Sequence, residues 1–338
     1  MDKRVASLPP SGFRSSKSIK RMLGVLLTLG LLYYLFVYID FKDIAIAFSR
    51  ISPGLLLVSF ALYLALYLFR TLRFVHLNNS AISFRDMFSI VCIHNFFNNI
   101  VPLRIGELSY VYLVNRQKSG TTGMGIATLI VARVFDFLLL ILFALVTFLL
   151  FPSAIVIPPT VYYTILAITL LLLFGLYSLL HFKSHIISVL RIFVRLLHLE
   201  KLRFIRTILD KIKESLENFR VVSSRRTMYL STFSTTLTLF AQYLFSFLLI
   251  RGMGITFSFT DVIVGSLLIL LVGILPIQGV GGFGTYEGAW TLVFLYFGVP
   301  SAQAIPAAFV LHFLQLFFLI ALGAFGMIDY RVRIGPFR

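Results

Sequence analysis

Asn98–Glu107 (NNIVPLRIGE) and Pro276–Gly288 (PIQGVGGFGTYEG) are the two stretches that decide the fold of this chain. In each, a proline closes a short apolar run, and a glutamate beside a glycine precedes a second short apolar run. Neither run is long enough to cross a bilayer. Unwound backbone at membrane depth is tolerated only around a protein-lined cavity. Two such breaks, one in each half of a membrane protein, predict a transport site.

The composition identifies an integral membrane protein. Hydrophobic residues make up 59% of the chain, charged residues make up 13%, and the mean hydropathy is +0.96. These values exclude an ordinary soluble domain. The single cysteine, Cys92, excludes an intramolecular disulfide and a cysteine-based zinc site. Metal-ligand spacings, a nucleotide-phosphate loop and a serine-nucleophile elbow are absent from the sequence, so we predict no metal, no cofactor and no catalytic residue.

Six apolar runs are long enough to span a membrane as helices. They cover residues 22–39, 52–69, 124–150, 160–180, 227–250 and 303–328. Shorter runs flank the two breaks, at 87–101 and 105–114 and at 262–275 and 286–298. We therefore predict an all-α integral membrane protein with six full transmembrane helices and two re-entrant helical hairpins, 86–114 and 262–298. An alternative with ten crossings, in which each hairpin is two short spans, stays open.

Basic residues set the predicted orientation. With these spans, 25 of the 30 lysines and arginines fall on one side, which is then cytoplasmic and holds both termini. This count places Arg70 and Arg73 on the cytoplasmic side, just after the second span. The net charge of +17 then reflects sidedness rather than nucleic-acid binding. We predict a multi-pass protein of the cell (inner, cytoplasmic) membrane, in which the run after Arg21 is a retained span and not a signal peptide.

The charges around the two hairpins predict an inverted-topology repeat. Basic residues flank residues 86–114 at both ends, whereas the loops around 262–298 are nearly uncharged. The first hairpin therefore enters from the cytoplasm and the second from outside. We predict one transmembrane domain, 1–338, made of a first repeat (1–150) and an inverted second repeat (159–330), as in many alternating-access carriers.

The one sizeable polar segment, residues 182–226, combines helical apolar spacing with many basic residues. It is either a basic amphipathic helix lying on anionic membrane lipids or an ordinary cytoplasmic connection.

The first break carries charge at membrane depth, where each charged group costs about 2.5–3.5 kcal/mol on insertion scales. Arg104 presents a planar guanidinium fork that suits a phosphate. Glu107 either pairs with Arg104 as a structural ion pair or balances it when the site is empty. Asn98 and Asn99 offer amide groups to a ligand or cap the first half-helix. In the third span, Arg133 and Asp136 lie three residues apart and can pair on one helix face or line the cavity.

The second break is rich in glycine. Gly281, Gly282 and Gly284 let backbone N–H groups face a cavity, and the half-helix that begins near Thr285 points its positive dipole end there. Glu287 close to Arg104 would form a gate pair between the repeats. A dinucleotide fingerprint is excluded, because no βαβ context surrounds these glycines. His94 and His312 are better explained as hydrogen-bonded packing residues than as members of a proton relay.

Taken together, these motifs resemble the lysylphosphatidylglycerol synthase transmembrane-region family of flippase-like bacterial and archaeal membrane proteins. The resemblance rests on Asn99-x-x-Pro102-x-Arg104-x-Gly106-Glu107, Arg133-x-x-Asp136, and Pro276 followed by Gly281-Gly282-x-Gly284-x-x-Glu287. It implies movement of a lipid with a phosphate-bearing headgroup, either an aminoacylated phosphatidylglycerol or a polyprenyl-phosphate-linked sugar. It also implies that Arg104, Glu107, Arg133, Asp136 and Glu287 line the central cavity. Full-length synthases carry a soluble aminoacyl-transferase domain, which we expect this chain to lack.

Four functions are compatible with the sequence. A lipid flippase is the first, with transport either downhill or coupled to ions and with a carboxylate as a candidate proton carrier. A secondary carrier of a small soluble anion is the second, and a lateral opening to lipid would separate the two. A membrane enzyme acting on a polyprenyl lipid and a scaffold without transport are the others. A homo-oligomer is compatible with the small-residue helix faces, which are also needed within one chain.

Overall fold

The computed structural model describes residues 41–101, 106–150, 224–274 and 280–334, and a few helical residues between 163 and 174. Within these ranges the chain forms nine α-helices and one short 3-10 turn, and no strand, which confirms the all-α prediction there. Of the helices in the described residues, four, α3, α6, α10 and α13, are long and apolar enough to cross a membrane. The predicted span 22–39, most of 160–180 and the polar segment up to residue 223 lie outside the described residues.

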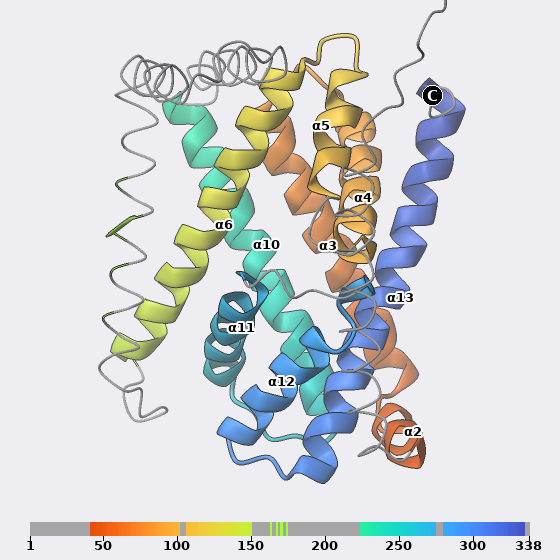
Figure 1. The fold of residues 1–338 in the computed structure, drawn as a ribbon, viewed down its shortest axis with the longest axis vertical. Helices are drawn as coiled ribbons and strands as arrows, with labels where there is room; N and C mark the ends of the chain where they lie inside the picture. Colours follow the sequence, from red (N-terminus) through yellow and green to blue (C-terminus); the bar gives the residue numbers. More distant parts are fainter. Residues whose placement is uncertain are drawn as a thin grey trace, which may run out of the picture.

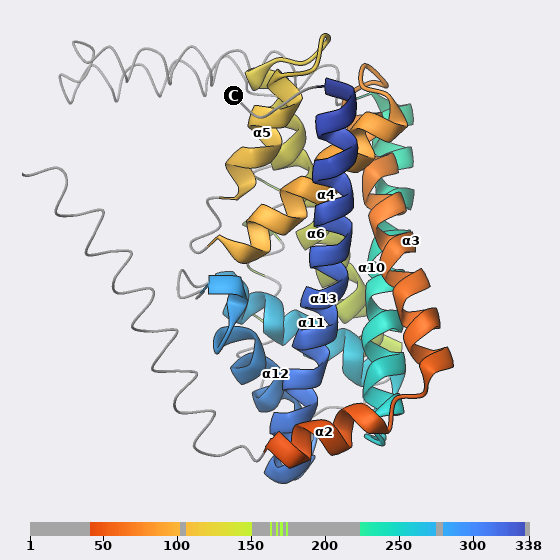
Figure 2. The ribbon, with the colours of Figure 1, turned by 90° about the vertical axis from the view of Figure 1, so that its right-hand side faces the viewer.

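Two long helices, α3 (Pro53–Leu77) and α10 (Arg225–Gly252), lie side by side along one face of the bundle (Figure 2). Each begins at a serine N-cap, Ser52 or Ser224, whose hydroxyl accepts a hydrogen bond from the backbone N–H three residues on. The helix α3 is longer than the predicted span 52–69, because the apolar pattern continues to Leu77. Arg70 and Arg73 therefore lie inside this helix, and their predicted position beyond it is corrected.

The helices α4 (Phe84–Ile100) and α5 (Glu107–Asn115) match the short runs that flank the first break. The helix α4 ends where a proline follows Val101, whose backbone is extended (ψ 124°). At the tip, a Cβ on Gly106 would come within 2.3 Å of the Phe97 carbonyl group, so only glycine lets the two helices approach this closely. The two helices then pack against each other as neighbours.

The helices α11 (Phe259–Ile274) and α12 (Thr285–Tyr296) match the runs around the second break, and the turn η3 (Val280–Gly282) lies between them. Figure 1 shows α4 and α5 near the end of the bundle where α13 finishes, and α11 and α12 nearer the opposite end, where the short helix α2 (Phe41–Ser49) packs on α13. The end of α4 packs against η3, so the two breaks meet in the middle of the molecule.

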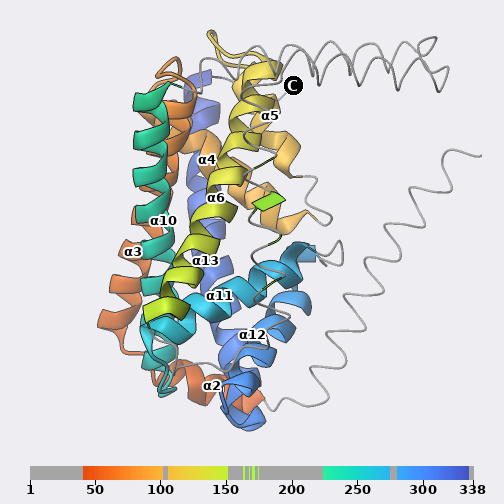
Figure 3. The same cartoon turned by 90° about the vertical axis from the view of Figure 1, so that its left-hand side faces the viewer.

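The remaining long helices, α6 (Thr122–Leu150) and α13 (Ser301–Ile334), each contact the short helices of both breaks. The helix α4 packs along α13 (Figure 2), and α11 packs on α6 (Figure 3). Within the same half of the chain, α5 contacts α6 and α12 contacts α13. One continuous apolar core joins both halves, with fully buried rings such as Tyr67, Phe245 and Phe294.

Candidate functional site

An arginine–carboxylate pair lies deep between α3 and α6. The guanidinium of Arg73 donates to both carboxylate oxygens of Asp136, one of them at 3.3 Å, and donates to the Thr235 hydroxyl of α10 at 3.3 Å. The Arg73 side chain is only 2% exposed, whereas that of Asp136 is 26% exposed. A charge buried to this extent requires a partner, because desolvation costs several kcal/mol. Arg73 thereby ties three helices together at one point.

Arg133 extends this pair to the first break. Its guanidinium lies 2.9 Å from the Glu107 carboxylate, at the first residue of α5, and 3.7 Å from Asp136, three residues along its own helix. The predicted pairing of Arg133 with Asp136 is therefore confirmed. Glu107 pairs with Arg133, whereas its predicted alternative partner, Arg104, lies outside the described residues.

The cluster also includes Arg70, whose guanidinium donates to the Asn95 side-chain oxygen of α4 at 2.6 Å. Asn95 is buried and its amide donates to the Val91 carbonyl at 2.8 Å. Among the described residues, the cluster of Arg70, Arg73, Glu107, Arg133 and Asp136 thus sets three guanidinium groups against two carboxylates. The result is an excess of positive charge inside a bundle of apolar helices.

The second break holds a different arrangement. Glu287 is completely buried, and its carboxylate accepts a hydrogen bond from the Gly284 N–H at 2.8 Å and lies 2.7 Å from the His312 ring nitrogen Nδ1. The ring of Tyr286 stacks on His312 with 4.4 Å between centroids, and the Tyr286 hydroxyl donates to Gln315 at 2.7 Å. Glu287 therefore caps its own helix and joins α12 to α13.

The predicted glycine turn is present. Gly281, Gly282 and Gly284 all have positive φ, at 65°, 75° and 82°, a region that side chains of other residues rarely adopt. Thr285 begins α12, as predicted, and its hydroxyl donates to the Gly282 carbonyl at 3.0 Å. The anion at this helix N-terminus is thus the Glu287 carboxylate of the protein itself.

Two other predicted site residues lie at the end of α4. The Asn99 side chain donates to the Asn95 carbonyl at 2.8 Å, which does not cap the helix end. The Asn98 side-chain oxygen is buried and has no hydrogen-bond partner among the described residues. Arg104, the predicted gate partner of Glu287, lies outside the described residues. Within them, Glu287 pairs with His312.

The sequence reading missed three contributors, namely Arg70, Arg73 and Thr235. The sequence does contain an indication for the two arginines. The helical pattern continues past them through Phe74 and Leu77 and stops only at Asn78. Thr235 carried no such indication, because a threonine in an apolar helix is ordinary. His312 is hydrogen-bonded, as predicted, and the identity of its partner, Glu287, depends on how α12 meets α13.

An apolar groove lies between α3 and α13, beside the end of α2. It has a volume of about 710 Å³ and is lined by Phe48, Pro53, Leu56, Leu57, Phe60, Phe313, Leu314, Phe317, Phe318 and Ala321. At its inner end Phe60 and Phe318 pack together, and Tyr63 contacts both Phe318 and Tyr67. The guanidinium of Arg70 lies 5.9 Å above the Tyr67 ring. A chain of aromatic contacts thus connects the groove to the charged cluster.

Comparison with protein families matches residues 21–323 to the model described as the lysylphosphatidylglycerol synthase TM region. Searches of curated proteins and of solved structures found no match. The matched region includes the charged cluster and both breaks. The chain therefore belongs to the lysylphosphatidylglycerol synthase transmembrane-region family.

Proposed function

We propose that this protein is a flippase-like membrane transporter that moves a lipid with a phosphate headgroup, either a polyprenyl-phosphate-linked sugar or an anionic or aminoacylated phospholipid. The observation that carries the proposal is the cluster of three arginines and two carboxylates inside the apolar bundle. Membership of the family supports a role in handling membrane lipids.

The chemistry of the cluster suits a phosphate. Guanidinium groups bind phosphate oxygens through paired hydrogen bonds and keep their charge in any environment. Glu107 and Asp136 balance Arg133 and Arg73, while Arg70 has the neutral amide of Asn95 as its partner. If Arg70 turned from the Asn95 amide to a phosphate, no carboxylate would lose its partner. Arg70 is therefore the arginine that can bind a headgroup at the lowest cost. Arg104, by its place in the sequence, is a further candidate.

A lipid substrate is favoured over a small soluble anion by the apolar groove. The groove between α3 and α13 faces the hydrocarbon region if α3 and α13 span the membrane, and the buried rings of Tyr63 and Tyr67 lie between the groove and Arg70. A lipid needs both a polar site for the headgroup and an apolar path for the chain. A soluble anion has no use for the second.

Alternating access between two inverted repeats is our proposed mechanism. The contacts support it, because exchanging α3 with α10, α4 with α11, α5 with α12 and α6 with α13 maps the main helix contacts onto one another. The starts of α4 and α11 also repeat a motif, Ser83-Phe84-Arg85-Asp86 and Ser258-Phe259-Thr260-Asp261. With both termini cytoplasmic, the first hairpin would open inward and the second outward.

The test is lipid scrambling in proteoliposomes with a labelled polyprenyl phosphate and a labelled phosphatidylglycerol. Arg70→Gln is the main variant, since it removes a guanidinium without orphaning a carboxylate. Arg251→Gln is the matched control, because Arg251 is an exposed arginine at the far end of α10. We expect the wild type and Arg251→Gln to move one or both lipids, and Arg70→Gln to lose at least about tenfold in rate, the effect of one charge-assisted contact.

A parallel assay follows uptake of soluble inorganic phosphate into the same vesicles. If wild-type protein takes up phosphate and moves neither lipid, the protein is a soluble-anion carrier and the lipid proposal is wrong. Arg104→Ala and Glu107→Gln extend the comparison to the two charged residues of the first break.

A further inference from the structure

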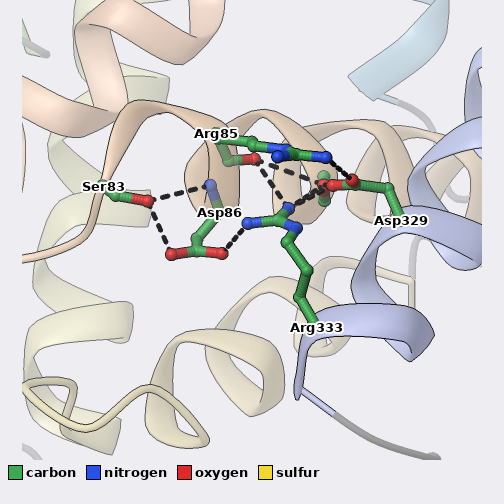
Figure 4. A network of polar contacts seen from close by, with 6 residues as sticks. Ser83, Arg85, Asp86, Asp329 and Arg333 are labelled. Atoms are coloured by element: carbon green, nitrogen blue, oxygen red, sulfur yellow. Dashed lines mark hydrogen bonds and ion pairs between the residues drawn. The ribbon is translucent and has the colours of Figure 1, made fainter.

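A second network of charges joins α4 to α13, far from the cluster described above. Figure 4 shows Arg333 of α13 lying between two carboxylates, Asp86 at the start of α4 and Asp329 one turn back on α13, and forming ion pairs with both. Arg85 reaches Asp329 at 3.0 Å, and Arg333 also donates to the Ser89 hydroxyl at 2.9 Å. The network therefore fastens the open end of the first hairpin to the end of a long helix.

The burial of these side chains is intermediate. The Asp329 side chain is 10% exposed, and those of Arg333 and Asp86 are 21% and 25% exposed. Arg85 is 73% exposed. A fully buried network would cost too much to separate, whereas these groups can exchange protein partners for water. The network can thus hold two helices together and still be released.

Behind this network, two glycines of α13 lie directly against α4. A Cβ on Gly326 would lie 2.6 Å from the Cys92 Cβ, and a Cβ on Gly323 would lie 2.7 Å from the Phe96 Cβ. The backbone of α13 therefore runs very close to α4, and the rings of Phe88 and Phe325 also meet across this seam. The ion pairs at the end of the seam add a polar attachment that water can replace when the helices separate.

The opposite end of the molecule lacks this fastening among the described residues. Asp261 is the counterpart of Asp86 at the start of α11, and its carboxylate accepts from the Ser258 N–H of its own helix at 2.8 Å. The helix α6, which α11 contacts, has no basic residue in its last turn, whereas α13 has Arg331 and Arg333 there. Among the described residues, α4 therefore has a charged bridge to its neighbouring long helix, whereas its counterpart α11 has none.

We propose that the network of Arg85, Asp86, Asp329 and Arg333 is a latch that holds the α4–α13 seam closed on the cytoplasmic side and opens during each transport cycle. The inference rests on the alternating-access mechanism proposed above. Release of the latch exposes the seam between α4 and α13 to the cytoplasm, while the α6–α11 contact opens without breaking an equivalent bridge.

The native Cys92 reports on the latch without any substrate. It is the single cysteine of the chain, is fully buried, and lies on the seam against Gly326. We would measure its rate of alkylation by a polar maleimide in detergent-solubilised protein. Asp86→Asn keeps the side chain able to bond Ser83 but removes the charge that pairs with Arg333. We expect alkylation to be about tenfold faster, which corresponds to the loss of roughly one charge-assisted hydrogen bond.

Two variants control this measurement. Asp261→Asn makes the same change at the equivalent position of the other half and should leave the rate at the wild-type value. Asp86→Glu keeps the charge and should stay close to wild type. Equal rates for Asp86→Asn and Asp261→Asn, in variants with unchanged thermal unfolding, would overturn the latch.

A disulfide tests whether the latch has to open. Gly326→Cys places a second thiol beside the native Cys92 and leaves the network intact, because a Cβ at residue 326 would lie 2.6 Å from the Cys92 Cβ and a small shift of the helices brings the pair to disulfide distance. We expect oxidation to stop lipid transport and reductant to restore it. Transport at the full rate by the oxidised protein would refute the proposal. If the wild type moves no lipid, the proposed function fails, and the alkylation rates still decide whether the latch exists.

Discussion

At the scale of single residues, Arg73 shows how the interior of this protein tolerates charge. Its guanidinium is almost completely buried, yet both carboxylate oxygens of Asp136 and the Thr235 hydroxyl accept its hydrogen bonds. The partners come from α6 and α10. The pair is therefore as much a constraint on helix packing as a feature of the proposed headgroup site.

Asp136→Asn should destabilise the protein by about 3 kcal/mol, because it leaves the Arg73 guanidinium buried without a counter-charge. Thermal unfolding in detergent is the measurement. Glu107→Gln is the comparison, since its partner Arg133 is 34% exposed and can turn to water. We expect a loss below about 1 kcal/mol there. Equal losses for the two variants would mean that Arg73 does not depend on Asp136.

Glu287 makes a second prediction at this scale. Because its carboxylate accepts from the Gly284 N–H and lies beside His312, Glu287→Ala removes a helix cap and the link to α13 together. We expect a loss of about 2 kcal/mol and faster hydrogen exchange in the first turn of α12. Glu287→Gln keeps an acceptor for Gly284 and should lose less. Unchanged exchange in Glu287→Ala would argue that the glycine turn holds this helix without the cap.

At the scale of elements, the short helices depend on their neighbours. The helices α5 and α12 have nine and twelve residues, too few to be stable alone in water. Each is held by a long helix, α6 or α13, and by its hairpin partner. Packing between helices, rather than helix propensity, therefore stabilises the short helices of the two hairpins.

Gly326→Ala tests the seam between α4 and α13. The added Cβ would lie 2.6 Å from the Cys92 Cβ and 3.0 Å from the Ser89 carbonyl oxygen, so the helices must move apart. We expect a loss of about 1–3 kcal/mol in thermal unfolding. Gly288→Ala is the control, since a Cβ there meets nothing within 4 Å, and it should be neutral or stabilising by up to about 1 kcal/mol. Destabilisation by Gly288→Ala of the same size would show that the measurement does not report on the seam.

At the scale of the whole molecule, the two breaks meet in the middle because α4 packs against η3. Re-entrant hairpins place both tips at membrane depth, whereas ten full crossings would bring each tip to the far surface. Locating the tips relative to the membrane therefore distinguishes re-entrant hairpins from ten crossings, whereas the distribution of basic residues does not.

Cysteine labelling of the tip makes this difference measurable. In a Cys92→Ser background, Asn99→Cys should resist a membrane-impermeant maleimide applied from outside, because re-entrant hairpins keep residue 99 within the membrane. Gly298→Cys, in the loop between α12 and α13, should react readily under the same conditions. Equally fast labelling of both positions would favour ten crossings.

Much of the architecture was predictable from the sequence, because it depends on local properties. Runs of apolar residues predict the helices α3, α6, α10 and α13, although the end of α3 was placed eight residues too early. The break after α4 follows from a proline, and the turn before α12 follows from Gly281, Gly282 and Gly284. The boundary of α3 does not follow from the sequence, because Arg70 and Arg73 indicate the end of a span, whereas Asp136 on α6 allows Arg73 to be buried.

The sequence by itself determined that this is an all-α membrane protein with two broken helical segments and a family identity, since hydropathy, proline, glycine and motif spacing act through nearby residues. Only the tertiary structure decided which charges meet. Arg73 binds Asp136, Glu107 binds Arg133, Glu287 binds His312 and Arg333 bridges Asp86 and Asp329. In each of these pairs except that of Arg333 with Asp329, the two partners lie on different helices. The pairing therefore depends on how the helices pack, a property of the whole chain that no local pattern encodes.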